Sequence, residues 1–597
     1  MTLRIDPVAL APDEPRDPFT VPGPLRWRRR LVLGLVLATV ASVALCAGLI
    51  AAAGGWTLPG ILLMLCVVAV TPWNAIGFWN AAIGLALLHL FPRALQRAVP
   101  VLAAPETDGP ILLRTAILMT LRNEDPARAL SRLRAVKAAL DATPAADRFD
   151  YFVLSDTSCP DVAAQEEAAI ARWQAQDGAR RIHYRRRADN IGFKAGNVRD
   201  FCKRWGAGYD VMLPLDADSL MGPAMILRMV RILQNAPQIG ILQSLVVGLP
   251  SASAFARIFQ FGMRAGMRCY TVGATWWAGD CGPFWGHNAL IRIAPFAAHC
   301  DLPVLPGRPP LGGPILSHDQ VEAVLMRRAG YEVWALPVEG ESFEENPPTL
   351  PDFLARDARW CLGNLQYLKL IGRPGLHPMG RFQLAWAVLM FATVPGVPLA
   401  LLLLPFAAPA MPAAAALPAA ALYLAILLLG LFPKIAGYLD VALTPGLMRR
   451  YGGGTRFAAS AAIEIGFSFL LGAISALATC GVLLRLLTGR ARGSWGGQAR
   501  DAHRVSWRAA ARGLAPTMAY GCAVAGLLLA FAPGLLIWVA PLLAGCWLAI
   551  PFAVLTADPR LGAVMARRRL CATPEEGDPP AILAALSGPV DPVRYAA

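Results

Sequence analysis

The sequence predicts a membrane protein in which a soluble α/β domain is inserted between α-helical transmembrane segments. Apolar residues make up 56% of its 597 residues and charged residues only 16%, whereas about a quarter of a typical soluble domain is charged. Long apolar runs lie toward both ends of the chain, and between them strand-like and helix-like patterns alternate. Such alternation predicts βαβ units and a parallel sheet.

The N-terminal part is expected to contain a tail and a pair of membrane helices. Residues 1–25 are rich in Pro and Asp and lack an apolar period, which is typical of disorder. Segment 26–98 opens with an Arg cluster and continues with two long apolar runs. Arg93 and Arg97 follow the second run, so the positive-inside rule returns the chain to the cytoplasm there.

The rest of the chain divides into three expected parts. Residues 99–380 form the cytoplasmic α/β domain with interfacial helices at its end, and 381–556 form a C-terminal transmembrane bundle with basic cytoplasmic loops. Residues 557–597 are expected to be a cytoplasmic tail. Basic loops flank 459–486 on both sides, so this run either violates the positive-inside rule or is an interfacial or re-entrant element. Roughly six to eight spans are compatible with the apolar runs.

The net charge of +15 and the cysteine pattern bear on nucleic-acid binding, disulfide bonds and zinc sites. In a membrane protein, the positive-inside rule accounts for an excess of Arg in cytoplasmic loops. The sequence has neither zinc-finger spacing nor a basic stripe interleaved with aromatic residues, so nucleic-acid binding is not expected. Its 12 Cys residues form no Cys-x-x-Cys pair, which indicates reduced thiols rather than a disulfide framework or a zinc site.

Polar side chains follow successive predicted strands at the point where each strand ends. Asn123 and Glu124 follow the first strand, Asp156 follows the second, and Asp216 and Asp218 follow a later one. In an open α/β sheet, ligands bind at the carboxyl ends of the strands. The last two carboxylates can share a divalent cation that also bridges a diphosphate. The alternative for this pair is a polar turn that caps the next helix.

Two glycine-containing stretches carry further candidates. Lys194 lies in NIGFKAGN, where the glycines allow close backbone approach and the lysine offers positive charge to a diphosphate. His287 and Asn288 lie in an aromatic stretch, where flat rings suit sugars and the two polar side chains can bond hydroxyls. The alternatives are a solvated loop for the first stretch and aromatic packing of a membrane-facing loop for the second.

Two helix-associated motifs complete the set of candidates. Asp319 stands where a loop enters a helix, so it is either a general base aimed at an acceptor hydroxyl or a helix cap. Arg356, Arg359 and Trp360 share one helical face by their i, i+3, i+4 spacing. They form either an interfacial anchor or a site where Arg holds a pyrophosphate and Trp stacks on a sugar.

Taken in order, these motifs resemble those of the processive inverting glycosyltransferases of family 2, which include the cellulose and hyaluronan synthases. That family has Asn-Glu after one strand, Asp after the next, an Asp-x-Asp, a base motif ending in Asp and a Gln-x-x-Arg-Trp. Here the motifs fall on Asn123–Glu124, Asp156, Asp216–Asp218, Ser317-His318-Asp319 and Arg356-Asp357-Ala358-Arg359-Trp360. There are two departures: Arg356 stands where Gln is usual, and the base motif has His-Asp where Glu-Asp is common.

Within this family, LRNEDP, NIGFKAGN, CGPFWGHNALIR and SHDQVEA look like the branch that builds osmoregulated periplasmic glucans. The resemblance implies a GT-A-like (Rossmann-like) domain, UDP-glucose as donor, Mg²⁺ or Mn²⁺ as cofactor and a growing β-glucan, mainly β-1,2, as acceptor. It also implies a multi-pass protein in the lipid bilayer of the bacterial inner membrane. The catalytic domain and both termini would be cytoplasmic, the chain would be passed to the periplasm, and a periplasmic glucan-processing protein would be a further partner.

The mechanism implied by the resemblance is a single inverting displacement. Asp216 and Asp218 would hold the metal ion on the diphosphate, and Asp319 would take the proton from the acceptor hydroxyl. The residues expected to bind the donor and the acceptor are Asn123, Glu124, Asp156, Lys194, Arg356, Arg359 and Trp360.

Three rival functions are compatible with parts of the sequence. Sugar transfer to a lipid phosphate carrier would use the Asp-x-Asp but has no need of Arg359 and Trp360. A non-catalytic polysaccharide export subunit would have no use for the full set of acidic residues. A plain transporter would leave the large α/β insertion unexplained.

Overall fold

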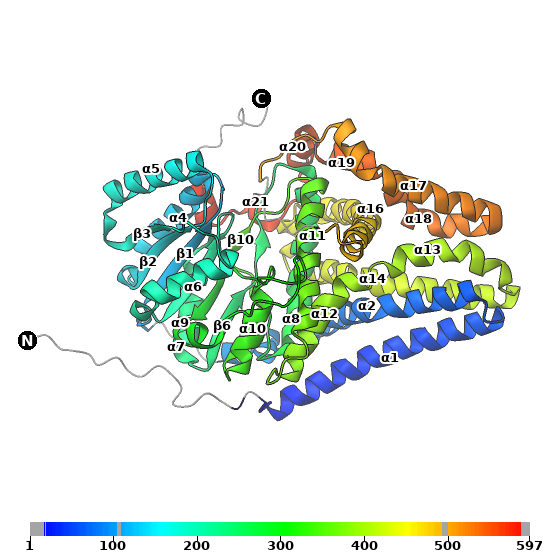
Figure 1. Cartoon of the computed structure of the whole chain (residues 1–597), viewed down its shortest axis with the longest axis horizontal. Helices are drawn as coiled ribbons and strands as arrows, with labels where there is room; N and C mark the ends of the chain where they lie inside the picture. Colours follow the sequence, from blue (N-terminus) through cyan, green and yellow to red (C-terminus); the bar gives the residue numbers. More distant parts are fainter. Residues whose placement is uncertain (1–16, 18, 104–108, 492–499, 587–597) are drawn as a thin grey trace, which may run out of the picture.

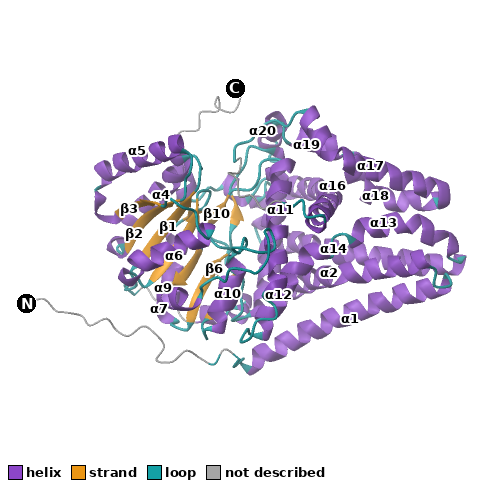
Figure 2. Cartoon of the chain, in the orientation of Figure 1, coloured by secondary structure: helices purple, strands orange, loops and turns teal. Residues whose placement is uncertain are grey.

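The computed structural model describes residues 17, 19–103, 109–491 and 500–586. An α/β domain lies at one end of the molecule and a bundle of long helices at the other (Figure 1). The strands all belong to the α/β end (Figure 2). The predicted fold class, an α/β domain between apolar helices, is confirmed. The tail expected over 1–25 lies largely outside the described residues, and helix α1 begins at Gly23.

The α/β domain is built on a seven-stranded sheet with the order β3-β2-β1-β4-β8-β6-β9. The strands are β1 (Thr115–Leu121), β2 (Phe149–Ser155), β3 (Ile182–Arg186), β4 (Val211–Asp216), β6 (Ile239–Ser244), β8 (Ala289–Arg292) and β9 (Glu332–Leu336). A second sheet has the order β5-β10-β7 and consists of β5 (Leu220–Met221), β10 (Ser342–Glu344) and β7 (Val247–Gly248).

The prediction of parallel strands is confirmed for β1 to β4 but is wrong for β8. Strand β8 runs antiparallel to both β4 and β6. The loop before β8 lies at the carboxyl end of β4, where the Asn288 amide donates a hydrogen bond to the Pro214 carbonyl at 2.9 Å. From that edge the chain can only run back along β4, which places Arg292 opposite Val211.

Helices cover both faces of the large sheet, so an apolar core lies on each face. The side chains of β1 point alternately into one core and the other. Ile117 and Met119 belong to one apolar core, whereas Ala116 and Leu118 belong to the other, as the two-residue period of a strand requires. The first core includes residues of α4 (Pro126–Asp141), α5 (Pro160–Asp177) and α7 (Pro223–Asn235), and the second includes residues of α6 (Phe193–Trp205), α9 (Ile293–His299) and α10 (Asp319–Arg328).

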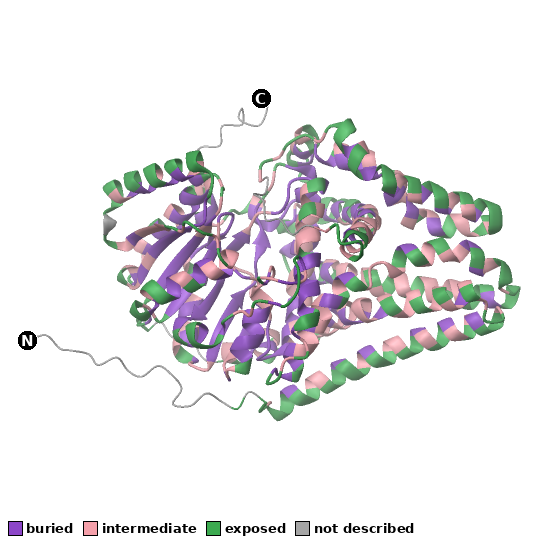
Figure 3. Ribbon diagram, viewed as in Figure 1, coloured by how far each residue is buried: buried purple, intermediate pink, exposed green. Residues whose placement is uncertain are grey.

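The helical bundle contains several elements that are long and apolar enough to span a membrane. The single helices are α1 (Gly23–Ala53), α2 (Leu58–Leu90), α14 (Ala416–Leu443), α16 (Gly454–Leu487) and α17 (Trp507–Phe531). The bent pairs are α12 (Pro378–Ala392) with α13 (Gly396–Ala407), and α18 (Leu536–Trp547) with α19 (Ala549–Thr556). Side chains such as Leu45 and Leu49 of α1 are each 64% exposed, and exposed residues line the outer helices of the bundle (Figure 3). This pattern is that of a multi-pass membrane protein.

Helix α16 differs from the other long helices because both of its ends lie against the α/β side of the bundle. Near its start, Phe457 packs in one cluster with Phe261 of α8 (Ala254–Ala278). Near its end, Val482 packs in another cluster with Leu365 of α11 (Leu350–Leu365). In Figure 1, α16 is seen nearly end-on, whereas α1, α13 and α17 run lengthwise. Of the two readings for 459–486, an interfacial element fits this placement. By length and composition alone, α16 is a candidate span together with the other four helices and the two bent pairs.

The remaining helices tie the bundle to the α/β domain. They are α3 (Ala94–Ala98), α15 (Leu447–Arg450), α20 (Pro559–Arg567), α21 (Pro574–Gly577) and α22 (Ala581–Leu586). The last of these packs on α4 through Ile582 and Leu583. On α21, Glu576 pairs with Arg257 of α8 at 2.6 Å. The residues after the last span therefore fold back onto the α/β domain.

Helices α2 and α8 cross so closely that only glycine fits at the crossing. A Cβ atom on Gly84 would lie 1.8 Å from the Cys269 carbonyl oxygen, and one on Gly273 would lie 1.9 Å from the Asn80 carbonyl oxygen. Because these neighbours are backbone atoms, they cannot move aside as a flexible side chain can. This contact therefore fixes the first spanning pair against the α/β domain.

We expect Gly273→Val to lower the melting temperature and the folded yield of the purified protein. The added side chain must force α2 and α8 apart, and overpacking of this kind costs at least about 1–3 kcal/mol. The matched control is Gly472→Val on α16, where a Cβ meets nothing within 4 Å. Equal melting temperatures for the two variants would contradict the close crossing.

Candidate active site

One cavity at the carboxyl ends of the central strands brings all the predicted site residues together. Its volume is about 240 Å³. The predicted residues that line it are Asn123, Glu124, Asp156, Lys194, Asp216, Asp218, Asp319, Arg356, Arg359 and Trp360. The parallel register of β2, β1 and β4 ends these strands at the same edge, which is where an open α/β sheet binds its ligands.

Asn123 shapes the edge of the cavity by holding the neighbouring loop. Its backbone has a φ of 54°, a left-handed conformation that Asn tolerates better than most residues. Its side-chain oxygen accepts hydrogen bonds from the Ser158 and Cys159 amides at 3.0 and 2.9 Å. The loop after β2 is thereby fastened to the loop after β1.

Asp156 is engaged by an arginine that the sequence analysis did not single out. Both carboxylate oxygens of Asp156 accept from the Arg187 guanidinium at 2.7 Å. The Asp156 side chain is 4% exposed and that of Arg187 11% exposed. A paired, buried carboxylate of this kind positions the wall of the cavity, and its partner Arg187 also donates to the Phe193 carbonyl at the start of α6.

Each carboxylate of the Asp-x-Asp motif faces a different cation. Lys194 forms an ion pair with Asp216, which also accepts from the Thr120 hydroxyl at 3.2 Å. Arg500 pairs with Asp218 at 2.5 Å. Arg500 lies on the segment between α16 and α17, so the bundle contributes directly to the cavity.

Burial and neighbouring charges shift the pKa values of the carboxylates in the cavity. Burial raises the pKa of Glu124, and the neighbouring Asp218 and Asp216 raise it further against the opposing effect of Arg500. Burial likewise raises the pKa of Asp218 against Arg500. For Asp216, burial is outweighed by Lys194 and His287, which hold its pKa below the ordinary value. Each of these buried carboxylates therefore has a cation beside it, Arg500 for Glu124 and Asp218, and Lys194 with His287 for Asp216.

The donor set suits a hard divalent ion that shares its coordination with a ligand. Carboxylate oxygens are the ligands that Mg²⁺ and Mn²⁺ prefer. Among the described residues, no group of three or more His, Cys, Asp or Glu side chains is placed to hold a metal ion. Asp216 and Asp218 could therefore supply part of a coordination shell, with phosphate oxygens and water completing it, as is usual for Mg²⁺.

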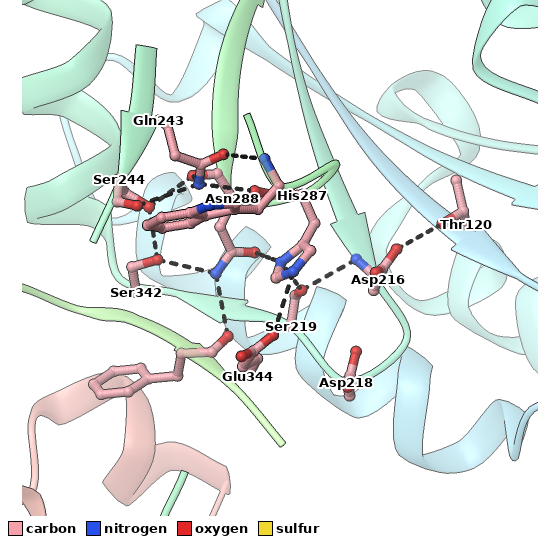
Figure 4. A network of polar contacts seen from close by, with 12 residues as sticks. Thr120, Asp216, Asp218, Ser219, Gln243, Ser244, His287, Asn288, Ser342 and Glu344 are labelled. Atoms are coloured by element: carbon pink, nitrogen blue, oxygen red, sulfur yellow. Dashed lines mark hydrogen bonds and ion pairs between the residues drawn. The ribbon is translucent and has the colours of Figure 1, made fainter. Parts of the chain in front are cut away.

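A buried polar network connects the Asp-x-Asp turn with β10 (Figure 4). The His287 ring lies 3.3 Å from both the Ser219 hydroxyl and the Glu344 carboxylate. Burial lowers the pKa of His287, but Glu344 and Asp216 outweigh burial and raise it to about 9. Asn288 anchors the same loop by donating to the Ser342 hydroxyl at 2.9 Å. His287 is therefore a cation beside the carboxylates, and its aromatic stretch forms a wall of the cavity.

Asp319 is the first residue of α10 and lines the cavity without a polar partner among the described residues. The helix N-cap is His318, whose side chain makes no capping bond. His318 instead pairs with Glu322 at 2.8 Å. Tyr367 holds the loop in place by donating to the Ser317 carbonyl at 2.9 Å. A carboxylate that is held at a cavity wall and left unbonded is suited to accept a proton.

The face of α11 predicted from spacing points into the same cavity. Arg356 lies over the Trp360 ring, with its Cζ atom 4.7 Å from the ring centroid. Trp360 is 43% exposed. Burial lowers the pKa of Arg356, although Glu344 opposes this. The cavity thus offers one exposed aromatic side chain next to cationic groups.

Besides Arg187, two residues of the site, Arg500 and Glu345, were missed by the sequence analysis. Arg500 lies hundreds of residues from Asp218 in the chain, so no local pattern could pair them. Glu345 accepts from both Arg128 and Arg132 of α4 at 2.5 Å. Its position directly after β10 was the only signal, and that short strand was not predicted.

A family model matches part of the chain. The model of the family described as "Glycosyl transferase family group 2" matches residues 211–431. The fold and the cavity therefore define a membrane-bound glycosyltransferase of family group 2.

Full-length relatives identify the family more narrowly. The glucans biosynthesis glucosyltransferase H of Xanthomonas oryzae pv. oryzae is 36% identical over 95% of this chain and 90% of its own. The relative from Vibrio cholerae is 36% identical over 96% of this chain and 81% of its own. The relative from Caulobacter vibrioides is 38% identical over 81% of this chain and 76% of its own. The chain belongs to the glucans biosynthesis glucosyltransferase H family and is a glucosyltransferase.

One solved structure is similar to part of this chain, with low sequence identity. A mannosyltransferase from Pyrobaculum calidifontis, in complex with GDP-Man and Mn²⁺, covers 62% of this chain and 99% of its own. The sequence identity is 18% and the TM-score 0.39.

We expect Arg500→Gln to strengthen binding of Mn²⁺ to the protein without nucleotide sugar. The substitution removes the guanidinium that competes for Asp218, and relief of a partly buried charge should tighten binding by roughly tenfold. Electron paramagnetic resonance of free Mn²⁺ measures the affinity. The control is Arg199→Gln, whose side chain is exposed and pairs with Asp301. Unchanged or weaker binding in Arg500→Gln would show that Arg500 does not compete with the ion.

Proposed function

We propose that the protein polymerises glucose from UDP-glucose into the β-glucan backbone, mainly β-1,2, of osmoregulated periplasmic glucans and passes the chain across the inner membrane. One observation carries the proposal: a single cavity combines an Asp-x-Asp turn, an unbonded carboxylate and an exposed Trp on a membrane-docked domain. Relatives named for glucan biosynthesis support the substrate class.

The donor is held at the strand ends. Asn123, Glu124 and Asp156 form the wall on which the uridine rests, with Asp156 fixed in place by Arg187. Lys194 and Arg359 line the same cavity and supply positive charge to the diphosphate. Asp216 and Asp218 hold Mg²⁺ or Mn²⁺. When bound, the ion stabilises the charge that develops on the departing diphosphate.

The chemistry is one inverting displacement at the anomeric carbon of the donor. An acceptor hydroxyl oxygen forms the new bond to this carbon as the bond from carbon to the diphosphate oxygen breaks, and UDP leaves with the bonding electrons. Asp319 accepts the proton of the hydroxyl. His287, held by Glu344, adds positive charge beside the carboxylates and offsets part of their repulsion.

The acceptor end of the cavity lies at α11. Trp360 stacks on the terminal sugar of the glucan, and Arg356 covers part of the ring. Helix α11 leads within a short connection to α12, the first element of the C-terminal bundle. The growing chain thus starts next to the spanning helices, which provide the path that a polar glucan needs through hydrocarbon.

The orientation follows from the arginines at the helix ends. The catalytic domain and both termini are cytoplasmic, and six elements cross the inner membrane. The product reaches the periplasm, where a glucan-processing protein is the expected partner.

We expect the purified protein to release UDP from UDP-glucose with Mg²⁺ and to form a ladder of hexose units that mass spectrometry resolves. Asp319→Asn should lower turnover by roughly 10²–10⁴, the usual worth of a general base, while UDP binding persists. The control is Asp147→Asn, whose side chain is 77% exposed and lies outside the cavity.

Each outcome separates the proposal from its rivals. A ladder lost in Asp319→Asn and kept in Asp147→Asn supports the glucan polymerase. UDP release with one hexose on a lipid would indicate transfer to a lipid carrier. Absence of release with any UDP-sugar, or normal turnover in Asp319→Asn, would overturn the proposed mechanism.

A further inference from the structure

A second cavity, away from the active site, lies where the first two spans meet the α/β domain. Its volume is about 510 Å³, and residues of α1, α2, α3 and α8 line it. The residues that define it are Trp27, Arg28, Leu87, Phe91, Arg97 and Trp276. None of these residues lines the active-site cavity. The proposed mechanism therefore gives this cavity no role.

Two arginines with uncompensated charge stand together in this cavity. The Arg28 guanidinium donates to the Arg97 carbonyl at 3.1 Å and to the Trp276 carbonyl at 3.2 Å. Within the described part of the chain, neither Arg28 nor Arg97 forms an ion pair with a carboxylate. The adjacent Arg29, in contrast, is paired with Asp280 at 2.6 Å. Arg28 and Arg97 thus present two positive charges to the same space.

Aromatic rings hold the two guanidinium groups in position. The Arg28 Cζ atom lies 5.0 Å from the centroid of the Trp276 ring, and the Arg97 Cζ atom lies 5.6 Å from that of Phe91. Trp27 meets Trp276 edge to face at 6.2 Å. Tryptophan side chains are typical of the boundary between lipid and water, so these contacts place the cations at headgroup level.

The surroundings of the cavity are apolar and exposed. Leu90 is 75% exposed, Trp27 59% and Phe91 47%. These side chains continue onto the outer faces of α1 and α2, which face hydrocarbon. A ligand that suits the site therefore needs an anionic group for the arginines and apolar chains for the adjoining surface, a combination that inorganic phosphate, a nucleotide or an acidic peptide lacks.

We infer that this cavity binds the headgroup phosphate of an anionic phospholipid, whose acyl chains lie along α1 and α2. The lipid belongs to the cytoplasmic leaflet if the orientation proposed above holds, whereas its binding does not depend on the enzyme's activity. The site lies beside Arg29, which pairs with Asp280, itself paired with Arg327 of α10 at 2.8 Å. The bound lipid thus seats the first spans against the catalytic domain.

Native mass spectrometry of the full chain tests the inference. Wild-type protein in nanodiscs of phosphatidylcholine and phosphatidylglycerol should retain phosphatidylglycerol preferentially after release. The double variant Arg28→Gln/Arg97→Gln should weaken this retention by about twenty-five-fold, since each basic residue near an anionic surface contributes about a factor of five. The single variant Arg97→Gln, at an exposed side chain, should lose about fivefold and serves if the double variant does not fold.

The control keeps the change in net charge constant. Arg26→Gln/Arg30→Gln removes two exposed arginines of α1 that do not line the cavity, and it should retain the lipid as wild type does. Equal loss in this control would show a general attraction of basic residues to lipid and overturn the site. If millimolar inorganic phosphate or glycerol phosphate displaced the retained phosphatidylglycerol as strongly as added lipid does, the phospholipid assignment would be overturned. Because no turnover is measured, failure here leaves the proposed enzymatic activity untouched.

Discussion

The parallel register of β2, β1 and β4 is the constraint on which the site depends. Thr115 pairs with Phe149 on one side and with Val211 on the other, so the three strands start at one level and end at one edge. Strands of a parallel sheet must be separated by crossover helices, which here are α4, α5 and α6. The polar residues at the carboxyl ends of the strands, Asn123, Asp156 and Asp216, consequently meet although they are far apart in the chain.

A second constraint is the balance of charge in the cavity, which joins the membrane bundle to the catalytic domain. Asp216 faces Lys194 from α6, and Asp218 faces Arg500 from the segment after α16. The same segment contacts α4 through the pair of Asp501 with Arg128 at 2.7 Å. The electrostatic environment of the Asp-x-Asp motif therefore depends on how the bundle is seated.

The sequence predicted those features that local patterns encode. Alternating apolar runs located β1 to β4 with their helices. The strand-end motifs identified Asn123 and Asp218, the loop before a helix identified Asp319, and all three line one cavity. It could not predict that β8 runs antiparallel, because direction depends on where the preceding loop lies in the folded sheet. Nor could it find Arg500, whose partner Asp218 is distant in sequence. Helix α16 has the composition of a span, and that composition could not predict how its two ends pack against α8 and α11.

Coupling of synthesis to transfer across the membrane is the central claim, and one measurement tests it directly. Purified protein in sealed vesicles would receive labelled UDP-glucose and Mg²⁺ from outside, so that only molecules with an outward catalytic domain react. The account predicts labelled glucan in the lumen, resistant to added glucanase until detergent opens the vesicles. Product that remains wholly digestible outside, or that is found only on lipid, would contradict the account.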